Sequence, residues 1–176
     1  MKAIVFALTG LGNIVVEELL NQNVNILFLS TRKEVGEYPY FKCSNIVELC
    51  NKNKIPVFED KVSFPYDCDL LISATFHKKI LIDECKFKLG VNIHPSFLPF
   101  LKGKDPIKNA IETKEQNLGI TTHKITNKFD IGDILFQKRI RFYQNDTKKS
   151  LIRKLKPLYK SHTDMLIKYY KKNYEH

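Results

Sequence analysis

Two polar side chains suited to acyl chemistry lie close together near the middle of the chain, at Asn92 and His94. The run 91–94 is otherwise apolar and is stopped by Pro95, which predicts a buried strand. Side chains two apart on a strand point to the same face. There the amide could hydrogen-bond a developing oxyanion and the imidazole could move a proton, which indicates acyl transfer. A histidine before a proline also has a purely structural interpretation, so the pair alone does not decide.

A carboxylate lies on a tight turn further along, at residues 130–133, which contain Asp130, Gly132 and Asp133. Such a carboxylate could orient a histidine or take its proton. Asp and Gly are also favoured turn residues, so a plain turn stays open as an alternative. Two neighbouring carboxylates also raise glycoside hydrolysis, but the chain has no Trp for a sugar platform and no second acidic cluster.

The pair Gly10 and Gly12 forms another candidate, between the apolar run 2–8 and a helical pattern. A glycine turn at the start of a helix can hold a phosphate with backbone N–H groups. A complete dinucleotide fingerprint needs a small residue where Val15 stands, and an acid after the second strand. Both are missing, so NAD binding is disfavoured. A structural turn and a contact to a substrate phosphate or sugar both stay open.

Alternating strands and helices must position these groups. We predict strands at 2–8, 25–30, 56–58, 69–73, 91–94, 118–126 and 133–142, the last two paired around the turn at 130–133. We predict a helix opened by Gly10 and Gly12, a second helix with Ser44 as its N-cap, and a third with Pro106 in its first turn that runs to about residue 113. We predict a last helix at about 147–171 that is bent or split at Pro157. This order predicts an α/β fold, a three-layer sandwich with a mainly parallel sheet. In such sheets ligands bind at the carboxyl ends of the strands.

The composition excludes several classes of protein. The chain has 176 residues, 43% apolar and 27% charged, which fits a single domain over 1–176 rather than a disordered or fibrous chain. No stretch approaches the roughly 20 apolar residues of a membrane span. The apolar run before Gly10 is too short for a signal peptide, so we predict a cytoplasmic protein with no membrane partner. The four cysteines lack zinc-site spacing, so we predict no metal.

The net charge of +10 is concentrated at the C-terminal end. From Lys138 onward, 12 Lys/Arg and 3 Asp/Glu give +9, which leaves +1 for the other 137 residues. A basic tail can bind nucleic acid, but a tail rich in Lys and poor in Arg is also typical of a solvated helix. A nucleic-acid-binding module is therefore a second, disfavoured hypothesis. We also predict that His162 and His176 lie at the surface.

Three ordered motifs resemble those of the folate-dependent formyltransferases. Residues 91–99, VNIHPSFLP, are similar to the family's N-x-H-P-S-x-L-P signature, and Lys102 and Gly103 follow like its basic-residue-then-glycine step. Residues 119–124, GITTHK, resemble its G-[VI]-T-x-H strand. Residues 130–135, DIGDIL, resemble its D-[TA]-G-x-I-[IL] loop. Three motifs in order and at suitable spacing are far more specific than any one of them.

The resemblance implies a Rossmann-like fold, N10-formyltetrahydrofolate as the formyl donor, and a catalytic triad of Asn92, His94 and Asp130. Asp133 falls on a variable position and is not assigned. The loop 74–81 would wrap the folate against an opposing wall at 129–132. The residues implied for the donor are Phe76, Ile80, Leu81, Phe129, Ile131 and Gly132. Those considered for the acceptor are Gly10, Gly12, Ser96, Lys102, Gly103 and His123, with Ser96 shaping its loop.

The family's acceptors include nucleotide-linked amino sugars, glycinamide ribonucleotide and methionyl-tRNA. We favour the amine of a nucleotide-linked sugar. The tract from 38 to 58 resembles the sugar and methionyl-tRNA branches more, and Leu11 is apolar where the ribonucleotide enzymes have a phosphate loop rich in Ser and Asn. The length leaves no room for the C-terminal barrel of the methionyl-tRNA enzymes. We expect acceptor specificity from the loop 32–42 and the tail. A homodimer is considered because apolar tail residues lack an assigned partner: Tyr143, Leu158, Tyr169 and Tyr170.

Overall fold

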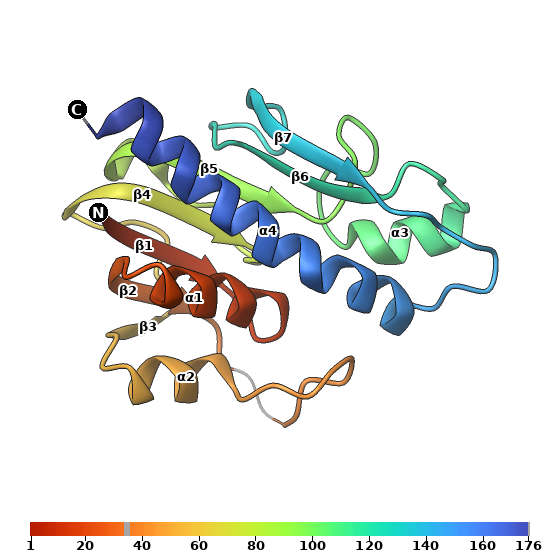
Figure 1. Cartoon of the computed structure of the whole chain (residues 1–176), viewed down its shortest axis with the longest axis horizontal. Coiled ribbons are helices and arrows are strands. Elements are labelled where there is room, and N and C mark those ends of the chain that lie inside the picture. Colours follow the sequence, from red (N-terminus) through yellow and green to blue (C-terminus); the bar gives the residue numbers. More distant parts are fainter. Residues whose placement is uncertain (34–35, 176) are drawn as a thin grey trace.

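The computed structural model describes residues 1–33 and 36–175 of the chain, which form one seven-stranded sheet in the order β3-β2-β1-β4-β5-β6-β7 (Figure 1). The strands are β1 Lys2–Ala7, β2 Asn25–Thr31, β3 Val57–Glu59, β4 Asp67–Ala74, β5 Lys86–His94, β6 Gly119–Lys124 and β7 Ile134–Arg139. The helices are α1 Leu11–Asn21, α2 Ile46–Lys52, α3 Pro106–Thr113 and α4 Lys148–Tyr174, with a 3-10 helix, η1, at Ile82–Glu84. Pairing is parallel from β3 to β5 and antiparallel for β6 and β7. The predicted α/β, Rossmann-like fold with a mainly parallel sheet is confirmed.

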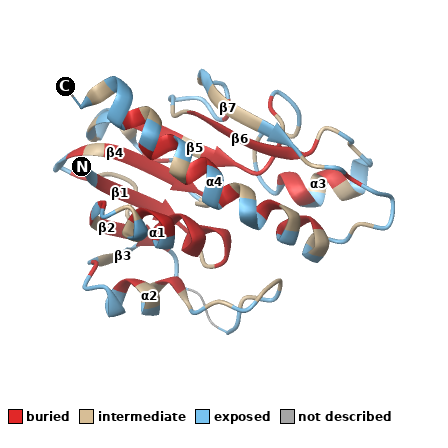
Figure 2. Ribbon diagram, in the orientation of Figure 1, coloured by how far each residue is buried: buried red, intermediate tan, exposed pale blue. Residues whose placement is uncertain are grey.

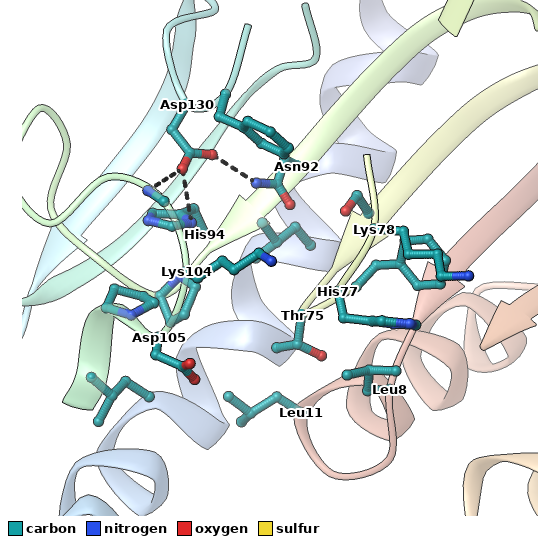
Figure 3. Close-up of a pocket in the computed structure, with 18 of the residues that line it drawn as sticks. Leu8, Leu11, Thr75, His77, Lys78, Asn92, His94, Lys104, Asp105 and Asp130 are labelled. Atoms are coloured by element: carbon teal, nitrogen blue, oxygen red, sulfur yellow. Dashed lines mark hydrogen bonds and ion pairs between the residues drawn. The ribbon is translucent and has the colours of Figure 1, made fainter. Parts of the chain in front are cut away.

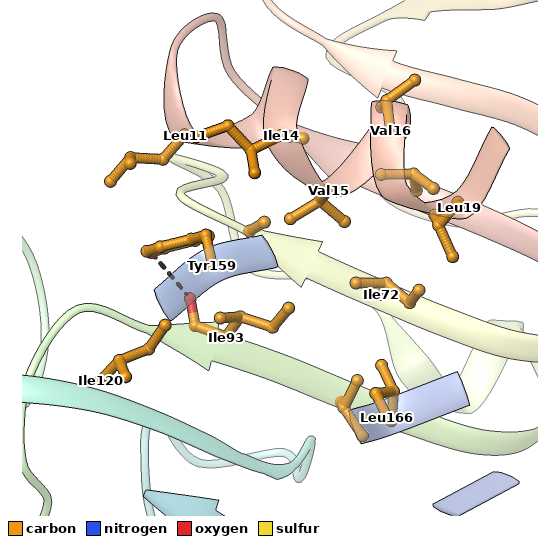
Figure 4. Packing of buried hydrophobic residues seen from close by; sticks show 14 of the residues in the cluster. Leu11, Ile14, Val15, Val16, Leu19, Ile72, Ile93, Ile120, Tyr159 and Leu166 are labelled. Atoms are coloured by element: carbon orange, nitrogen blue, oxygen red, sulfur yellow. Dashed lines mark hydrogen bonds between the residues drawn. The ribbon is translucent and has the colours of Figure 1, made fainter. Parts of the chain in front are cut away.

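One hydrophobic core lies between the sheet and the helices. It contains apolar side chains of α1, α2, α3 and α4 together with alternate residues of the central strands. Figure 4 shows Val15 of α1 and Tyr159 of α4 packed over Ile72 and Ile93 of the sheet. The central strands and the inner side of α1 are buried, whereas much of α2 is exposed (Figure 2). The sequence pattern follows from this, since strands covered on both faces are apolar throughout.

The opposite face of the sheet is covered by loops and η1. Phe6 and Phe28 point to this face and pack against Phe64, with ring centroids 6.2 and 5.7 Å from it. Ile80 closes the same small core from the segment after β4. The third layer is therefore made of loop segments rather than long helices, and it brings the segment after β4 close to the sheet.

The last helix, α4, runs unbroken from Lys148 to Tyr174, so of the two predicted outcomes, a bend or a split at Pro157, the split is wrong. A proline removes the hydrogen bond to the carbonyl four residues earlier, here that of Arg153. Both residues are exposed, so water can satisfy this carbonyl, while Leu155 and Tyr159 on the inner side are fully buried. Tertiary packing therefore keeps the helix continuous at the proline. In the described part of the chain no helix is long and apolar enough to cross a membrane.

Packing of α4 also supplies partners for most of the apolar tail. Tyr170 is buried and donates a hydrogen bond to Asp69 at 3.0 Å, and Leu158 and Tyr169 pack against the core. Tyr143 stays 49% exposed. The reason for considering a homodimer therefore falls away for three of these four residues.

His162 was predicted at the surface and is in fact buried, with its Nδ1 2.9 Å from the Thr122 hydroxyl. Its helix position turns it toward β6 rather than toward water. His176 and part of the loop 32–42, residues 34–35, lie outside the described residues.

The start of α2 differs from the prediction by one residue. Asn45 rather than Ser44 caps the helix, because its Oδ1 accepts a hydrogen bond from the Val47 N–H at 2.9 Å. The Ser44 carbonyl instead accepts a hydrogen bond from Asn13 at 3.0 Å. β5 begins at Lys86 rather than at residue 91, since the alternation Lys-Phe-Lys is itself a strand pattern at a sheet surface.

Candidate active site

The carboxyl ends of β5 and β6 bring three polar side chains together. Asn92 and His94 of β5 face one cavity. Antiparallel pairing sets Asn92 opposite His123 of β6, so these two side chains are neighbours, with Asn92 Nδ2 3.4 Å from His123 Nε2. The strand register thus places His123 in the same cluster as the two β5 residues.

Asp130, in the loop after β6, joins this cluster through both carboxylate oxygens (Figure 3). Its Oδ2 accepts a hydrogen bond from the Gly103 N–H at 2.7 Å, and its Oδ1 accepts one from Asn92 Nδ2 at 3.2 Å. His94 Nδ1 lies 3.7 Å from Oδ2, and His123 Nε2 lies 3.4 Å from Oδ1. One carboxylate therefore connects two strands and the loop that follows β5.

The loop geometry explains how Asp130 is held there. Asp130 has a left-handed backbone, with φ 53°, which Asp tolerates better than most residues. A Cβ at Gly132 would lie 1.9 Å from the Lys124 carbonyl oxygen, so only glycine allows the loop to fold back on β6. Asp133 pairs with Lys124, its Oδ2 lying 3.1 Å from Nζ, and the Asp133 side chain is largely exposed. Gly132 thus acts on the position of Asp130.

His94 is 5% exposed, and its Nε2 lies 3.0 Å from the Leu101 carbonyl oxygen. A carbonyl only accepts, so we assign the proton of the neutral ring to Nε2, which leaves Nδ1 as a free base facing Asp130. The loop that supplies this carbonyl is closed by Ser96, whose buried hydroxyl donates to the Phe100 carbonyl at 2.9 Å. Ser96 therefore shapes this loop, which is one of the two roles that the sequence suggested for it, the other being contact with the acceptor.

Burial and charge set the protonation of this cluster. Burial lowers the pKa of His94 below its ordinary value, although the charge of Asp130 acts in the opposite direction. Burial would raise the pKa of Asp130, but the hydrogen bond from His123, the charge of His94 and the Gly103 N–H together lower it to about 2. At neutral pH the site therefore holds a charged carboxylate beside a neutral His94.

A cavity of about 790 Å3 opens above this cluster at the carboxyl edge of the sheet. That volume suits a ligand of drug or cofactor size. Phe76, Ile80 and Phe129 give it an apolar wall. Its described lining holds seven basic side chains and two carboxylates: Arg32, Lys78, Lys79, Lys104, Lys108, Lys128 and Lys148 against Asp105 and Asp130. This excess of positive charge favours anionic ligands.

The cavity thus takes up most of the catalytic and donor residues implied by sequence. Its lining contains Asn92, His94, Asp130, Phe76, Ile80, Phe129, Gly103 and His123. The other implied residues are not part of its described lining: Leu81 and Ile131, which are exposed, and Gly132, Lys102, Ser96, Gly10 and Gly12. Sequence reasoning did not single out Lys104 or Lys148, because a solvated lysine and one that lines a cavity have the same local pattern.

The glycine turn before α1 is closed by protein side chains. A Cβ at Gly10, where φ is 103°, would lie 2.1 Å from the Tyr38 ring, so the ring sits directly over the turn. The Gly10 N–H donates to Asn13 Oδ1 at 2.8 Å. A Cβ at Gly12 would lie 2.8 Å from that of Ala7, so this glycine lets α1 approach β1. Both glycines therefore have structural reasons to be there.

Within residues 1–33 and 36–175, no group of three His, Cys, Asp or Glu side chains is arranged to hold a metal ion. A protein-family profile described as formyl transferase matches residues 51–163, which contain the whole polar cluster.

Two curated proteins illustrate the relatives of this sequence. The bifunctional polymyxin resistance protein ArnA of Wigglesworthia glossinidia brevipalpis is 32% identical over 166 residues, 88% of this chain and 25% of that protein. The methionyl-tRNA formyltransferase of Pseudothermotoga lettingae is 40% identical over 103 residues, 55% of this chain and 34% of that protein. The chain thus spans about a third or less of the length of these two relatives.

A solved structure shares the fold over almost the whole chain. WlaRD, a sugar 3N-formyl transferase crystallised in the presence of dTDP and 5-N-formyl-THF, superposes with a TM-score of 0.83. The match covers 98% of this chain and 64% of that one, at 22% identity. At this identity the likeness concerns the fold.

Proposed function

The chain belongs to the formyl transferase family, and from this premise we propose that it moves a formyl group from N10-formyltetrahydrofolate to the amine of a nucleotide-linked amino sugar. The observation that carries the proposal is the cluster of Asn92, His94 and Asp130 on the floor of a basic cavity. Residues 1–176 then form the catalytic domain.

The donor fits the side of the cavity that is formed by the segment after β4. Phe76, Ile80 and Phe129 offer an apolar wall to a flat pterin ring, and Lys78 and Lys79 lie beside them for the carboxylates of a folate. Lys78 Nζ lies 2.9 Å from Asp60 Oδ2, which ties this segment to the end of β3. Leu81 and Ile131 are exposed at the outer rim and can reach the donor only if these segments close over it.

His94 and Asp130 account for the proton transfer. The amine attacks the formyl carbon, a C–N bond forms, and collapse of the tetrahedral intermediate breaks the bond to N10. The amine loses one proton and N10 gains one, so a single group can carry it. His94 is neutral at pH 7 and can accept this proton at Nδ1, where the Asp130 carboxylate 3.7 Å away stabilises the imidazolium. No acyl-enzyme forms, so no Ser or Cys nucleophile is needed.

Asn92 is assigned to the oxyanion. Its amide nitrogen now faces Asp130 and His123, and its oxygen points away from Asp130 in Figure 3. To donate to the formyl oxygen, Asn92 must give up one of these two contacts. The Gly103 N–H then keeps Asp130 in place, because it donates a hydrogen bond to the other carboxylate oxygen at 2.7 Å. Losing such an oxyanion donor typically slows a reaction by about 10²–10³.

Three observations bear on the choice of acceptor. The fold likeness to a sugar 3N-formyl transferase favours a nucleotide-linked sugar. The Tyr38 ring over Gly10 speaks against glycinamide ribonucleotide, whose enzymes in this family carry a phosphate loop at the corresponding turn. Methionyl-tRNA is the second candidate, because one relative with that name is 40% identical over 103 residues and α4 is rich in lysine.

A comparison of acceptors tests the proposal. The full chain is incubated with N10-formyltetrahydrofolate and, in turn, amino-sugar nucleotides, glycinamide ribonucleotide and methionyl-tRNA, and formylated product is measured by mass spectrometry. We expect turnover on at least one amino-sugar nucleotide and a loss of about 10² or more in kcat for Asp130→Asn. Turnover on one of the other two acceptors alone would reject the sugar. No turnover, together with no binding of 5-formyltetrahydrofolate, would reject formyl transfer.

A further inference from the structure

A second, shallower cavity of about 510 Å3 adjoins the first beside the beginning of α4, and we call it the side cavity. The two cavities share Tyr38 and Tyr40, whose ring centroids lie 5.3 Å apart. These rings therefore form the partition between them. The other residues that line the side cavity are Glu37, Pro39, Phe41, Lys42, Cys43, Lys149 and Arg153.

The side cavity combines aromatic rings with positive charge. Its described lining holds Lys42, Lys149 and Arg153 against a single acid, Glu37. Lys149 and Arg153 are four residues apart on α4, so they project from the same side of the helix. Neither forms a salt bridge within the described residues. Aromatic faces stack on nucleic-acid bases, and lysine and arginine bind phosphates.

Lys148 extends this basic surface into the main cavity. Its Nζ lies 5.5 Å from the centroid of the Tyr40 ring, and it lines the main cavity together with Ile152. A long anionic ligand can therefore start above Asn92 and His94 and continue past Tyr40 along the first turns of α4. The glycine turn offers no equal place, because Tyr38 covers it.

We infer that the side cavity binds the nucleoside diphosphate half of the acceptor, with its base against Tyr40 and its phosphates on Lys148, Lys149 and Arg153. This inference rests on the proposed function and adds the part of the chain that recognises the acceptor. The sugar then lies in the main cavity with its amine toward His94. Glu37 is the one described lining group that opposes such a ligand, since it repels phosphates.

Titration of a nucleoside diphosphate alone tests the inference. UDP and dTDP are titrated into the full chain by calorimetry, without donor. We expect saturable binding of at least one, weakened about tenfold by Arg153→Gln and by Lys149→Gln, as for the loss of a charge-assisted hydrogen bond. Glu37→Gln should tighten binding a few-fold, because it removes a like charge. Lys172→Gln, at the far end of the same helix, is the matched control and should bind like the wild type.

Tyr40 allows a separate test of the base. Tyr40→Phe keeps the ring and should bind like the wild type, whereas Tyr40→Leu should weaken binding about tenfold through lost stacking. Equal binding by both variants would show that the base does not stack on Tyr40. The charge variants do not touch the packing of the loop, so they keep the inference testable if Tyr40→Leu fails to fold.

Titration of 5-formyltetrahydrofolate into the same proteins separates this inference from the proposed function. A wild type that binds 5-formyltetrahydrofolate but neither nucleotide would overturn the side cavity and leave formyl transfer in place. Nucleotide binding that is unchanged in Arg153→Gln and Lys149→Gln would overturn it as well. A tRNA that binds the same residues and excludes the nucleotides would assign this surface to nucleic acid and overturn it in a third way. Failure of 5-formyltetrahydrofolate to bind the wild type would instead contradict the proposed function.

Discussion

Acid should destabilise this protein through His162, a buried histidine of α4. The imidazole lies beside the Thr122 hydroxyl and edge-on to Phe136, with ring centroids 5.3 Å apart. Burial, and to a lesser degree the charge of Lys138, lowers the pKa of His162 from 6.5 to about 4. The folded state therefore keeps this ring neutral at a pH where the unfolded chain protonates it. His162 therefore leaves the free energy of unfolding unchanged above pH 6.5 and lowers it as the pH falls from 6.5 to 4.

The size of this loss follows from the shift. One proton at about 1.4 kcal/mol per pH unit gives a loss of about 3 kcal/mol between pH 7 and pH 4. That is a substantial part of the roughly 5–15 kcal/mol that holds a domain of this kind together.

Urea denaturation of wild type and His162→Asn, at one-unit steps from pH 7 to pH 4, measures this contribution. The amide introduced by the substitution cannot titrate, although the smaller side chain lowers stability by a constant amount. Effects of the carboxylates cancel in the difference between the two proteins. We expect this difference to change by about 3 kcal/mol across the range, in favour of the variant at low pH. A constant difference, or an imidazole that titrates near pH 6.5 by NMR, would refute the reasoning.

Three further predictions concern the site and its support. Gly132→Ala places a Cβ against the Lys124 carbonyl and should displace Asp130, so we expect kcat to fall by about 10². Binding of 5-formyltetrahydrofolate, measured in parallel, would detect unfolding. The acid limb of kcat/KM should lie below pH 6.5, because His94 must be neutral to accept a proton. Asp130→Asn should move this limb to still lower pH, because the carboxylate raises the pKa of His94, and a shift to higher pH would contradict this. Tyr159→Phe removes the hydrogen bond to the Ile93 carbonyl, 3.1 Å long and fully buried, and should lower the free energy of unfolding by about 1–3 kcal/mol in urea, with kcat unchanged.

The sequence predicted the fold well because its signals are local and repeated. Apolar runs such as 2–8 and 69–73 fill strands buried on both faces, and the pairing of β6 with β7 follows from the turn between them. The errors have tertiary causes. Packing of Leu155 and Tyr159 carries α4 through Pro157, and burial of His162 depends on which side of a long helix meets the sheet.

The shared cavity of Asn92 and His94 was predictable from the sequence, whereas most of the other residues that line the cavity were not. Asn92 and His94 share a strand, so their common cavity follows from the strand period. The contact of Asn92 with His123 needs the register of two antiparallel strands, which no local pattern encodes. Tyr38 and Lys148 come from distant segments that meet only when α4 crosses the sheet.

Left-handed backbone conformations recur in the loops that surround the site. Among the described residues, Thr75, Leu101, Asp105 and Asp130 adopt left-handed conformations, with φ between 52° and 62°, in the loops at the carboxyl edge of the sheet. This conformation is unfavourable for a β-branched or large apolar residue and costs about 1–2 kcal/mol of free energy at each such position. Leu101 supplies the carbonyl that fixes the His94 ring, and Asp130 supplies the carboxylate beside it. The buried core therefore stabilises loop conformations that the loops would not adopt alone, and those conformations set the distances between the reacting groups.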